Sequence, residues 1–254
     1  TFATLATGGF STRFNSVGEF NSVSIDLIII FFMVCAGANF GLYFALIRGN
    51  WKTLFHDTEW RVYISVLAVC TLLVALNLSG WFGASAEQGV TLVHKQYDRF
   101  TEALRYACFQ VVSIMTTTGF CTDDFDKWPD FSRYLLVLLM FIGGCAGSTG
   151  GGLKVIRLVI LCKMAYWRLE KTFRPRVVRA VRIAGEPVDE SVQQTLYGFF
   201  VLYLFWAILG TLVMTSLGLP LVTAFTSVAA TLNNIGPGLE GVGAAMNYAN
   251  IPVV

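Results

Sequence analysis

Residues 102–120 read EALRYACFQVVSIMTTTGF, an apolar, helix-like stretch that runs into three threonines, a glycine and a phenylalanine. The helix-like part, residues 102–118, is shorter than the roughly 20 residues that a helix needs to cross the hydrocarbon core of a membrane. Backbone that leaves its helix at membrane depth is tolerated only where protein buries it or where it lines a watery cavity. The stretch therefore predicts a re-entrant segment, in which a short helix enters a membrane, stops and is followed by a loop.

The composition of the whole chain predicts that lipid is its main solvent. Of the 254 residues, 55% are hydrophobic and only 13% are charged, whereas a soluble domain carries about 25% charged residues. The mean hydropathy of +0.63 agrees with a membrane protein. The six cysteines form no Cys-x-x-Cys pair, so they predict neither a disulfide framework nor a zinc site.

Four stretches free of Asp, Glu, Lys and Arg are long enough to contain a membrane span. They are residues 27–47, 62–86, 134–153 and 191–239. The first two predict uninterrupted spans. The third predicts a broken span, because its second half is so rich in glycine that a regular helix there is costly. In the fourth, Pro220 separates a span from a second short re-entrant piece at 220–234.

A polar glycine loop recurs along the chain. The three copies are LATGGF at 5–10, MTTTGF at 115–120 and LNNIGP at 232–237, which we name the first, second and third loops. Aligned on Gly9, Gly119 and Gly236, they predict an internal repeat of span, short re-entrant helix, loop and span. Any single copy reads as a glycine that caps a helix. Three copies instead predict loops that converge, with carbonyl oxygens replacing the water shell of a cation.

Charge predicts the orientation. Residues 154–182 hold nine Lys or Arg against one acid, Glu170, which by the positive-inside rule places this segment in the cytoplasm. Alternating spans then place 48–61 inside and all three loops outside. The aromatic residues Tyr166, Trp167 and Phe173 interleave with the basic ones. Beside a span, this pattern indicates a membrane surface or a protein partner rather than nucleic acid.

TTTGF, followed by GGCAGSTGGGLK and then NNIGPG, resembles the TrkH and KtrB family of bacterial potassium transport proteins, closest to TrkH, over the whole chain. The resemblance implies an all-α membrane protein with span, re-entrant pore helix and span units around a pseudo-fourfold pore. It assigns residues 1–60 to the end of a second repeat, 61–182 to a third repeat with a broken second span and a basic cytoplasmic extension, and 183–254 to a fourth repeat truncated after its loop. We therefore expect a longer protein, with another repeat before Thr1 and another span after Val254.

The resemblance also implies site residues. It assigns an ion-binding selectivity filter to Thr7, Gly8, Gly9, Thr117, Thr118, Gly119, Asn234, Ile235 and Gly236. It assigns a gate that obstructs the pore beneath the filter to Gly143, Gly144, Gly147, Ser148, Thr149, Gly150, Gly151, Gly152 and Lys154. The implied function is potassium uptake across the bacterial cytoplasmic (inner) membrane, with potassium as the bound metal ion and no cofactor. The implied partners are lipid, a second copy of the chain in a homodimer, and a cytoplasmic ring of nucleotide-binding regulatory subunits of the TrkA type.

Other interpretations of the glycine-rich segment are weaker. A phosphate-binding loop would need G-x-x-x-x-G-K-[ST], and Leu153 separates the last glycine from Lys154. Close packing of helices is a second alternative at Gly143 to Gly147, which have the small-residue spacing. Gly37 to Gly41 have the same spacing, and close packing of helices is the favoured interpretation there.

Two other function classes agree less well with the sequence than a pore does. An ion-coupled secondary transporter has broken helices, but it does not predict three equivalent loops. A membrane-embedded enzyme needs polar or ionisable residues within its spans, and here the exceptions are Asn39 and Asn77, which hydrogen bonds between helices explain equally well. The sequence therefore predicts transport rather than catalysis, without deciding between a channel and ion-coupled transport.

Overall fold

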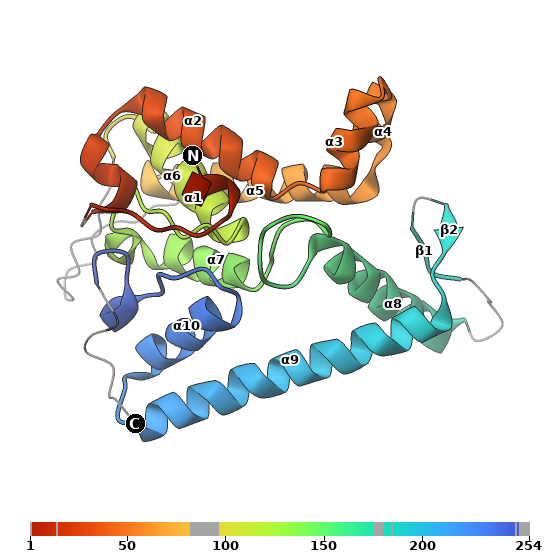
Figure 1. Cartoon of the computed structure of the whole chain (residues 1–254). Coiled ribbons are helices and arrows are strands. Elements are labelled where there is room, and N and C mark those ends of the chain that lie inside the picture. Colours follow the sequence, from red (N-terminus) through yellow and green to blue (C-terminus); the bar gives the residue numbers. More distant parts are fainter. Residues whose placement is uncertain are drawn as a thin grey trace.

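The computed structural model describes residues 2–13, 15–81, 97–174, 180–183, 185–246 and 248. Its helices are α1 (Phe2–Leu5), α2 (Val23–Ala36), α3 (Phe40–Ile47), α4 (Trp51–His56), α5 (Thr58–Leu78), α6 (Phe100–Met115), α7 (Asp130–Met140), α8 (Val155–Phe173), α9 (Glu190–Ser216) and α10 (Leu221–Leu232). Short 3₁₀ turns follow the three loops at η1 (Ser16–Phe20), η2 (Phe125–Lys127) and η3 (Glu240–Val242). Among the described residues the strands are β1 (Arg182–Ile183) and β2 (Glu186–Pro187), which pair antiparallel. The predicted helical membrane fold is confirmed (Figure 1).

Within the described part of the chain, two helices are long and apolar enough to cross a membrane, α5 and α9. Helix α5 begins at Thr58 rather than Val62 and ends at Leu78, while the predicted end of this span, at 82–86, lies outside the described residues. Helix α9 ends at Ser216, and Pro220 then stands at the N-cap of α10. The predicted division of the fourth stretch at Pro220 is therefore confirmed.

The prediction of an uninterrupted span at 27–47 is wrong. Helices α2 and α3 meet at an angle of 95°. A Cβ atom at Gly37 would lie 2.4 Å from the hydroxyl oxygen of Tyr63, so α2 ends where glycine alone fits. Asn39 then caps α3, because its Oδ1 accepts the N–H of Gly41 at 2.8 Å. Hydropathy did not reveal this break, since none of its residues is charged.

The two asparagines within the predicted spans have different roles. Asn77 on α5 accepts the hydroxyl of Ser132 on α7 at 2.6 Å, which confirms a hydrogen bond between helices. Asn39 instead caps its own helix, so the same interpretation is wrong there. The predicted break in the third span is confirmed, because α7 ends at Met140 and α8 starts at Val155. We call residues 143–154 between them the glycine-rich loop.

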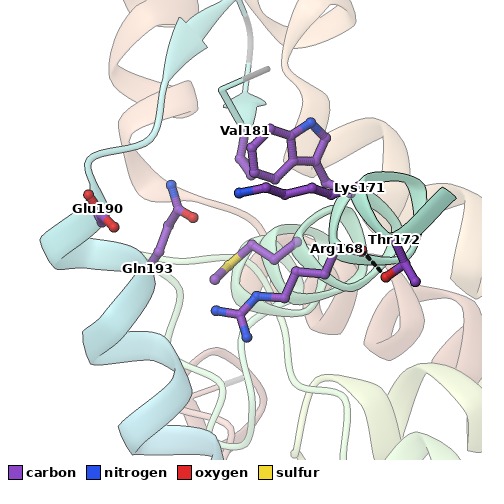
Figure 2. Close-up of a pocket in the computed structure, with 8 residues that line it drawn as sticks. Arg168, Lys171, Thr172, Val181, Glu190 and Gln193 are labelled. Atoms are coloured by element: carbon purple, nitrogen blue, oxygen red, sulfur yellow. Dashed lines mark hydrogen bonds between the residues drawn. The ribbon is translucent and has the colours of Figure 1, made fainter. Parts of the chain in front are cut away.

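The basic segment lies at one end of the molecule. In Figure 1, α3, α4, the end of α8 and the β1–β2 hairpin share this end, as the alternation of spans requires. Residues 175–179 of the segment lie outside the described residues. A pocket of about 440 Å³ opens between α8 and α9 here. Arg168, Lys171 and Gln193 line it, with the lysine and the glutamine on facing sides (Figure 2).

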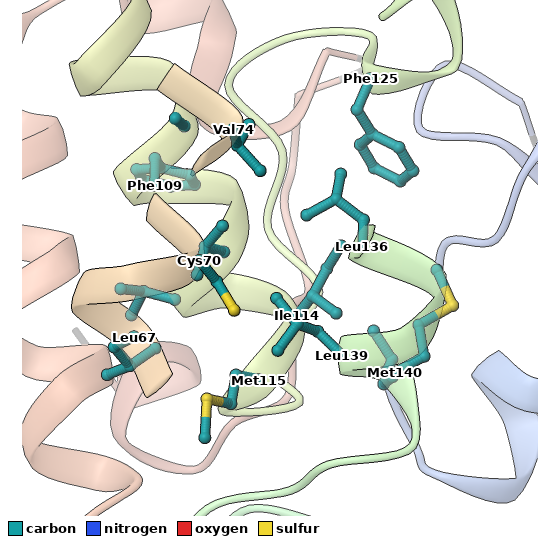
Figure 3. Close-up of a cluster of buried hydrophobic side chains, with 14 of the residues drawn as sticks. Leu67, Cys70, Val74, Phe109, Ile114, Met115, Phe125, Leu136, Leu139 and Met140 are labelled. Carbon is teal, nitrogen blue, oxygen red and sulfur yellow. The ribbon is translucent and has the colours of Figure 1, made fainter. Parts of the chain in front are cut away.

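Helix α6 is the centre of the core. Its residues from Phe109 to Met115 are buried, although it is too short to cross a membrane. It packs between α5 and α7, where Leu67 and Val74 face Ile114 and Leu136 (Figure 3). This second half of α6 carries no charged residue, as suits a helix segment in the interior of a protein. Its burial explains why a short helix is stable at this position.

An ion pair links α6 to the start of α2. The guanidinium of Arg105 lies 2.6 Å from Asp26, and the two side chains are 17% and 2% exposed. Replacing Arg105 with glutamine leaves the buried carboxylate without its charge partner and should lower the free energy of unfolding by about 3 kcal/mol. The measurement is thermal unfolding of the purified protein that contains this chain.

The exposed pair of Arg13 and Glu19, 3.3 Å apart with side chains 55% and 41% exposed, provides the control. Arg13→Gln should change the free energy of unfolding by less than about 1 kcal/mol, because water screens such a pair. Equal losses in the two variants would contradict a structural role for the buried pair.

Candidate functional site

The three loops share one backbone conformation. Thr7, Thr117 and Asn234 have φ values of 50°, 57° and 55°, and the glycines two residues later, Gly9, Gly119 and Gly236, also have positive φ. A left-handed conformation is unusual for a β-branched threonine. The positive φ that the glycines were expected to permit is present, and the residue that starts each turn was not foreseen.

The hydrogen bonds of the loops are also equivalent. In each loop the residue after the left-handed one donates its N–H to the carbonyl five residues earlier. These bonds run from Gly8 to Ala3 at 2.9 Å, from Thr118 to Ser113 at 2.9 Å and from Ile235 to Ala230 at 2.8 Å. The left-handed residue itself donates to the carbonyl three residues earlier. This is the Schellman ending of a helix, repeated at α1, α6 and α10.

The loops lie side by side in chain order. A Cβ atom at Gly9 would lie 2.0 Å from the carbonyl oxygen of Thr118, and one at Gly119 would lie 1.9 Å from that of Ile235. Each glycine of the first two loops thus meets the equivalent residue of the next loop. A Cβ atom at Gly236 has no described atom within 4 Å. The contact between the first and second loops is repeated between the second and third. The three loops therefore lie at consecutive positions around one line.

Several carbonyl groups of these loops are free to bind a ligand. Among the described residues, no donor hydrogen-bonds to the carbonyl oxygens of Thr7, Gly8, Thr117, Thr118, Asn234 or Ile235. Thr117 and Thr118 are both only 1% exposed, and a buried carbonyl without a partner is costly. Carbonyl oxygens gathered in this way can replace the hydration shell of a small cation.

The glycine-rich loop contacts all three loops. The hydroxyl of Thr7 donates to the carbonyl of Thr149 at 3.0 Å. The N–H of Gly151 donates to the hydroxyl of Thr117 at 2.6 Å. A Cβ atom at Gly151 would lie 2.4 Å from the carbonyl oxygen of Asn233 in the third loop. Residues 149–151 therefore lie across the ends of the short helices.

The same loop fills the break between α2 and α3. Cys145 donates its N–H to the carbonyl of Gly37 at 2.8 Å, and the N–H of Phe40 donates to the carbonyl of Gly147 at 3.1 Å. The N–H and the hydroxyl of Thr149 both donate to the carbonyl of Ala36. Two interrupted helices thus satisfy each other's backbone groups.

Close approaches explain the number of glycines. A Cβ atom would lie 2.1 Å from the carbonyl of Gly151 at Gly143, 2.7 Å from that of Gly37 at Gly144, and 3.0 Å from that of Thr116 at Gly150. Gly147 and Gly152 both have a φ of 68°. From Gly143 to Gly152 the glycines therefore allow close packing of loop backbone rather than of continuous helices, whereas Gly37 makes room for the side chain of Tyr63 on α5.

A lysine closes the loop on itself. Lys154 donates from Nζ to the carbonyl of Gly150 and, at 3.4 Å, to the hydroxyl of Ser148. The N–H of Gly143 donates to the carbonyl of Leu153 at 2.8 Å, which joins the two ends of the loop. The residues predicted for the gate thus form one compact unit beneath the three loops.

Sequence reasoning missed Glu59. One oxygen of this carboxylate, Oε1, accepts the N–H of Ala146 at 2.7 Å and the N–H of Ile156 at 3.1 Å. The residue is 6% exposed and lies in the first turn of α5. The available signal was a pair of acids, Asp57 and Glu59, shortly before a long apolar run. The stretch free of charge begins after them, so the predicted span excluded Glu59.

The acidic residues that follow the second loop are paired. Asp123 accepts the indole N–H of Trp128 at 2.9 Å, and Asp126 accepts the N–H of Glu240 at 2.8 Å, which links the second and third loops. The side-chain hydrogen bond and the charge of Asp124 raise the pKa of Lys127. This cluster therefore braces the outer ends of the loops.

These features define a membrane protein built from repeated re-entrant loops around one axis, with a broken span beneath them. The family model described as "TrkH: Cation transport protein" matches residues 1–250. The chain belongs to the TrkH family of cation transport proteins.

Its relatives include potassium uptake proteins. The chain is 41% identical over 251 residues to the Trk system potassium uptake protein TrkH of Salmonella typhimurium, covering 98% of this chain and 49% of that protein. It also resembles the crystal structure of the potassium transporter TrkH from Vibrio parahaemolyticus, with a TM-score of 0.86 and 37% identity, over 98% of this chain and 51% of that one. The chain spans about half the length of the curated relatives it matches.

The contact between loops yields a prediction. Gly119→Ala adds a Cβ atom 1.9 Å from the carbonyl oxygen of Ile235, at a φ of 77°. The matched control is Gly49→Ala, at a φ of 83° with no described atom within 4 Å. The control should lose only the strain of a left-handed residue, about 1–2 kcal/mol. Gly119→Ala should lose about 2 kcal/mol more, since overpacking is added. Thermal unfolding of both variants measures the difference, and equal losses would show that the loops do not touch.

Proposed function

We propose that this chain contributes three filter loops to a pore for potassium uptake. The observation that carries the proposal is the set of three equivalent, adjacent loops whose carbonyl groups lack hydrogen-bond donors among the described residues. The names of the relatives as potassium uptake proteins support the ion. In the whole protein a further loop would complete the ring beside Gly236, in keeping with the repeats at 1–60, 61–182 and 183–254.

The filter would hold a dehydrated cation with backbone groups alone. Helices α6 and α10 end at the second and third loops, so their negative dipole ends point at the site. Residues 7–9, 117–119 and 234–236 would supply carbonyl oxygens in place of water. No side chain is required to transfer a proton or form a bond. The role fits transport, and the family is described as a transport family.

The glycine-rich loop would be the gate of this pore. Its residues 149–151 contact all three loops from the side of the helix ends, where an ion leaving the filter must pass. A segment with little helix propensity can change its backbone conformation at modest cost. Movement of this loop would open the path without altering the filter above it.

The chain would lie in the bacterial inner membrane. Helix α9 exposes apolar side chains such as Leu202, Trp206 and Leu212, which suit lipid and the second copy of a homodimer. The basic segment at the other end of the molecule would face the cytoplasm. This segment, with its pocket at Arg168 and Lys171 (Figure 2), would anchor the chain at the inner membrane surface. It would also contact a regulatory ring of the TrkA type.

The filter is tested by Gly236→Ala in the whole protein. The φ of 105° at Gly236 disfavours a Cβ atom, yet no described atom would clash with it. The variant should fold but lose the geometry of the carbonyl ring, lowering the preference for potassium over sodium roughly tenfold, or about 1.4 kcal/mol. The control is Gly218→Ala, with a φ of 91° and no described atom within 4 Å.

Fluxes into liposomes measure this preference. An unchanged preference in the Gly236→Ala variant would argue against the filter. A flux that requires a second coupled ion would favour the secondary transporter, whose broken helices resemble those seen here.

The gate is tested by deleting residues 147–151. If the loop obstructs the pore, rubidium flux per folded molecule should rise several-fold, because the obstruction is removed while the filter is untouched. The preference among potassium, rubidium and sodium should stay as it was. Unchanged or reduced flux from well-folded deletion protein would rule out a gating role.

A further inference from the structure

The carboxylate of Glu59 connects the two ends of the glycine-rich loop. Ala146 lies near its start and Ile156 lies just after its end, on the first turn of α8. Both donate their N–H groups to the same oxygen atom, at 2.7 Å and 3.1 Å. The part of the loop that contacts the three filter loops, residues 149–151, lies between these two attachment points.

The surroundings of Glu59 favour a fixed carboxylate. The first N–H groups of a helix attract negative charge, and Ile156 presents such a group from the start of α8. Glu59 is 6% exposed, so water competes little for its hydrogen bonds. Its own helix starts at Thr58, so α5 sets the position of the carboxylate.

Two further hydrogen bonds lie at the ends of the glycine-rich loop. Val155 donates to the carbonyl of Gly144 at 3.2 Å, and Gly143 donates to that of Leu153 at 2.8 Å. These bonds join the two ends of the loop to each other. Among the described residues, Glu59 is the side chain that joins both of them to another helix through one atom.

We propose that Glu59 is a positioning residue of the gate, and that its carboxylate holds both ends of the glycine-rich loop to α5 so that residues 149–151 stay beneath the filter. The inference rests on the gating role proposed for this loop. Loss of the carboxylate removes the attachment of both ends to α5 at once, while Cys145 and Thr149 stay bonded to Gly37 and Ala36. The loop then leaves the obstructing position more often, while the filter keeps its geometry.

The test uses Glu59→Ala and Glu59→Gln in the whole protein, in liposomes, with rubidium flux counted per folded molecule. Glu59→Ala removes the acceptor and should raise the maximal flux at least threefold. The rubidium concentration at half-maximal flux and the preference for potassium over sodium should not change, because the filter is intact. Glu59→Gln keeps an oxygen acceptor for both N–H groups and should stay close to the unchanged protein.

Asp57→Ala is the matched control. Asp57 lies two residues earlier and caps α5 by accepting the N–H of Trp60 at 2.7 Å, without a hydrogen bond to the glycine-rich loop among the described residues. It should leave the maximal flux unchanged. If Glu59→Ala does not fold, Glu59→Asp replaces it, because a side chain shorter by one methylene cannot reach both N–H groups and should raise the flux in the same way.

Combining Glu59→Ala with the deletion of residues 147–151 separates the inference from the proposed function. If Glu59 acts through the loop, the double variant should conduct no more than the deletion alone. Additive increases, or an unchanged flux in the folded Glu59→Ala protein, would overturn the role of Glu59 even where the deletion raises flux. A deletion that fails to raise flux would instead overturn the gate itself.

Discussion

The structure depends on how backbone groups are satisfied where membrane helices stop. The carbonyl groups at the end of α2 have no partner within their helix, and each finds one elsewhere. Val34 and Cys35 accept the hydroxyls of Tyr63 and Tyr43, while Ala36 and Gly37 accept N–H groups of the glycine-rich loop. In lipid such groups would cost several kcal/mol each. The break in one span is therefore stable because the break in another lies against it.

The same constraint links the glycine-rich loop to the three polar glycine loops. The loops at 5–10, 115–120 and 232–237 leave carbonyl groups unpaired, and two of the loops hold a threonine in a left-handed conformation. Strain of this kind persists where the surrounding structure fixes it, commonly at functional sites. The hydrogen bonds of Thr7 and Thr117 to the glycine-rich loop provide part of that fixation. The hydrogen bonds within each turn hold the rest of its conformation, so the glycine-rich loop can move while the three loops keep their shape.

The sequence predicted the features that depend on composition and recurrence. The short helices, the break after α7 and the division at Pro220 follow from apolar length, glycine content and proline. The bend at Gly37 could not be predicted in this way, because the groups that surround it, Tyr63 and the glycine-rich loop, are distant in the sequence. Glu59 was missed for a related reason, since its importance comes from two N–H groups almost 100 residues away.

The central claim, that the three loops converge to bind a cation with backbone oxygens, is tested most directly by anomalous diffraction from rubidium in crystals of the whole protein. We expect a rubidium peak on the axis of the loops, in contact with carbonyl oxygens from residues 7–9, 117–119 and 234–236. A well-ordered structure whose rubidium peaks all lie away from these loops would contradict it.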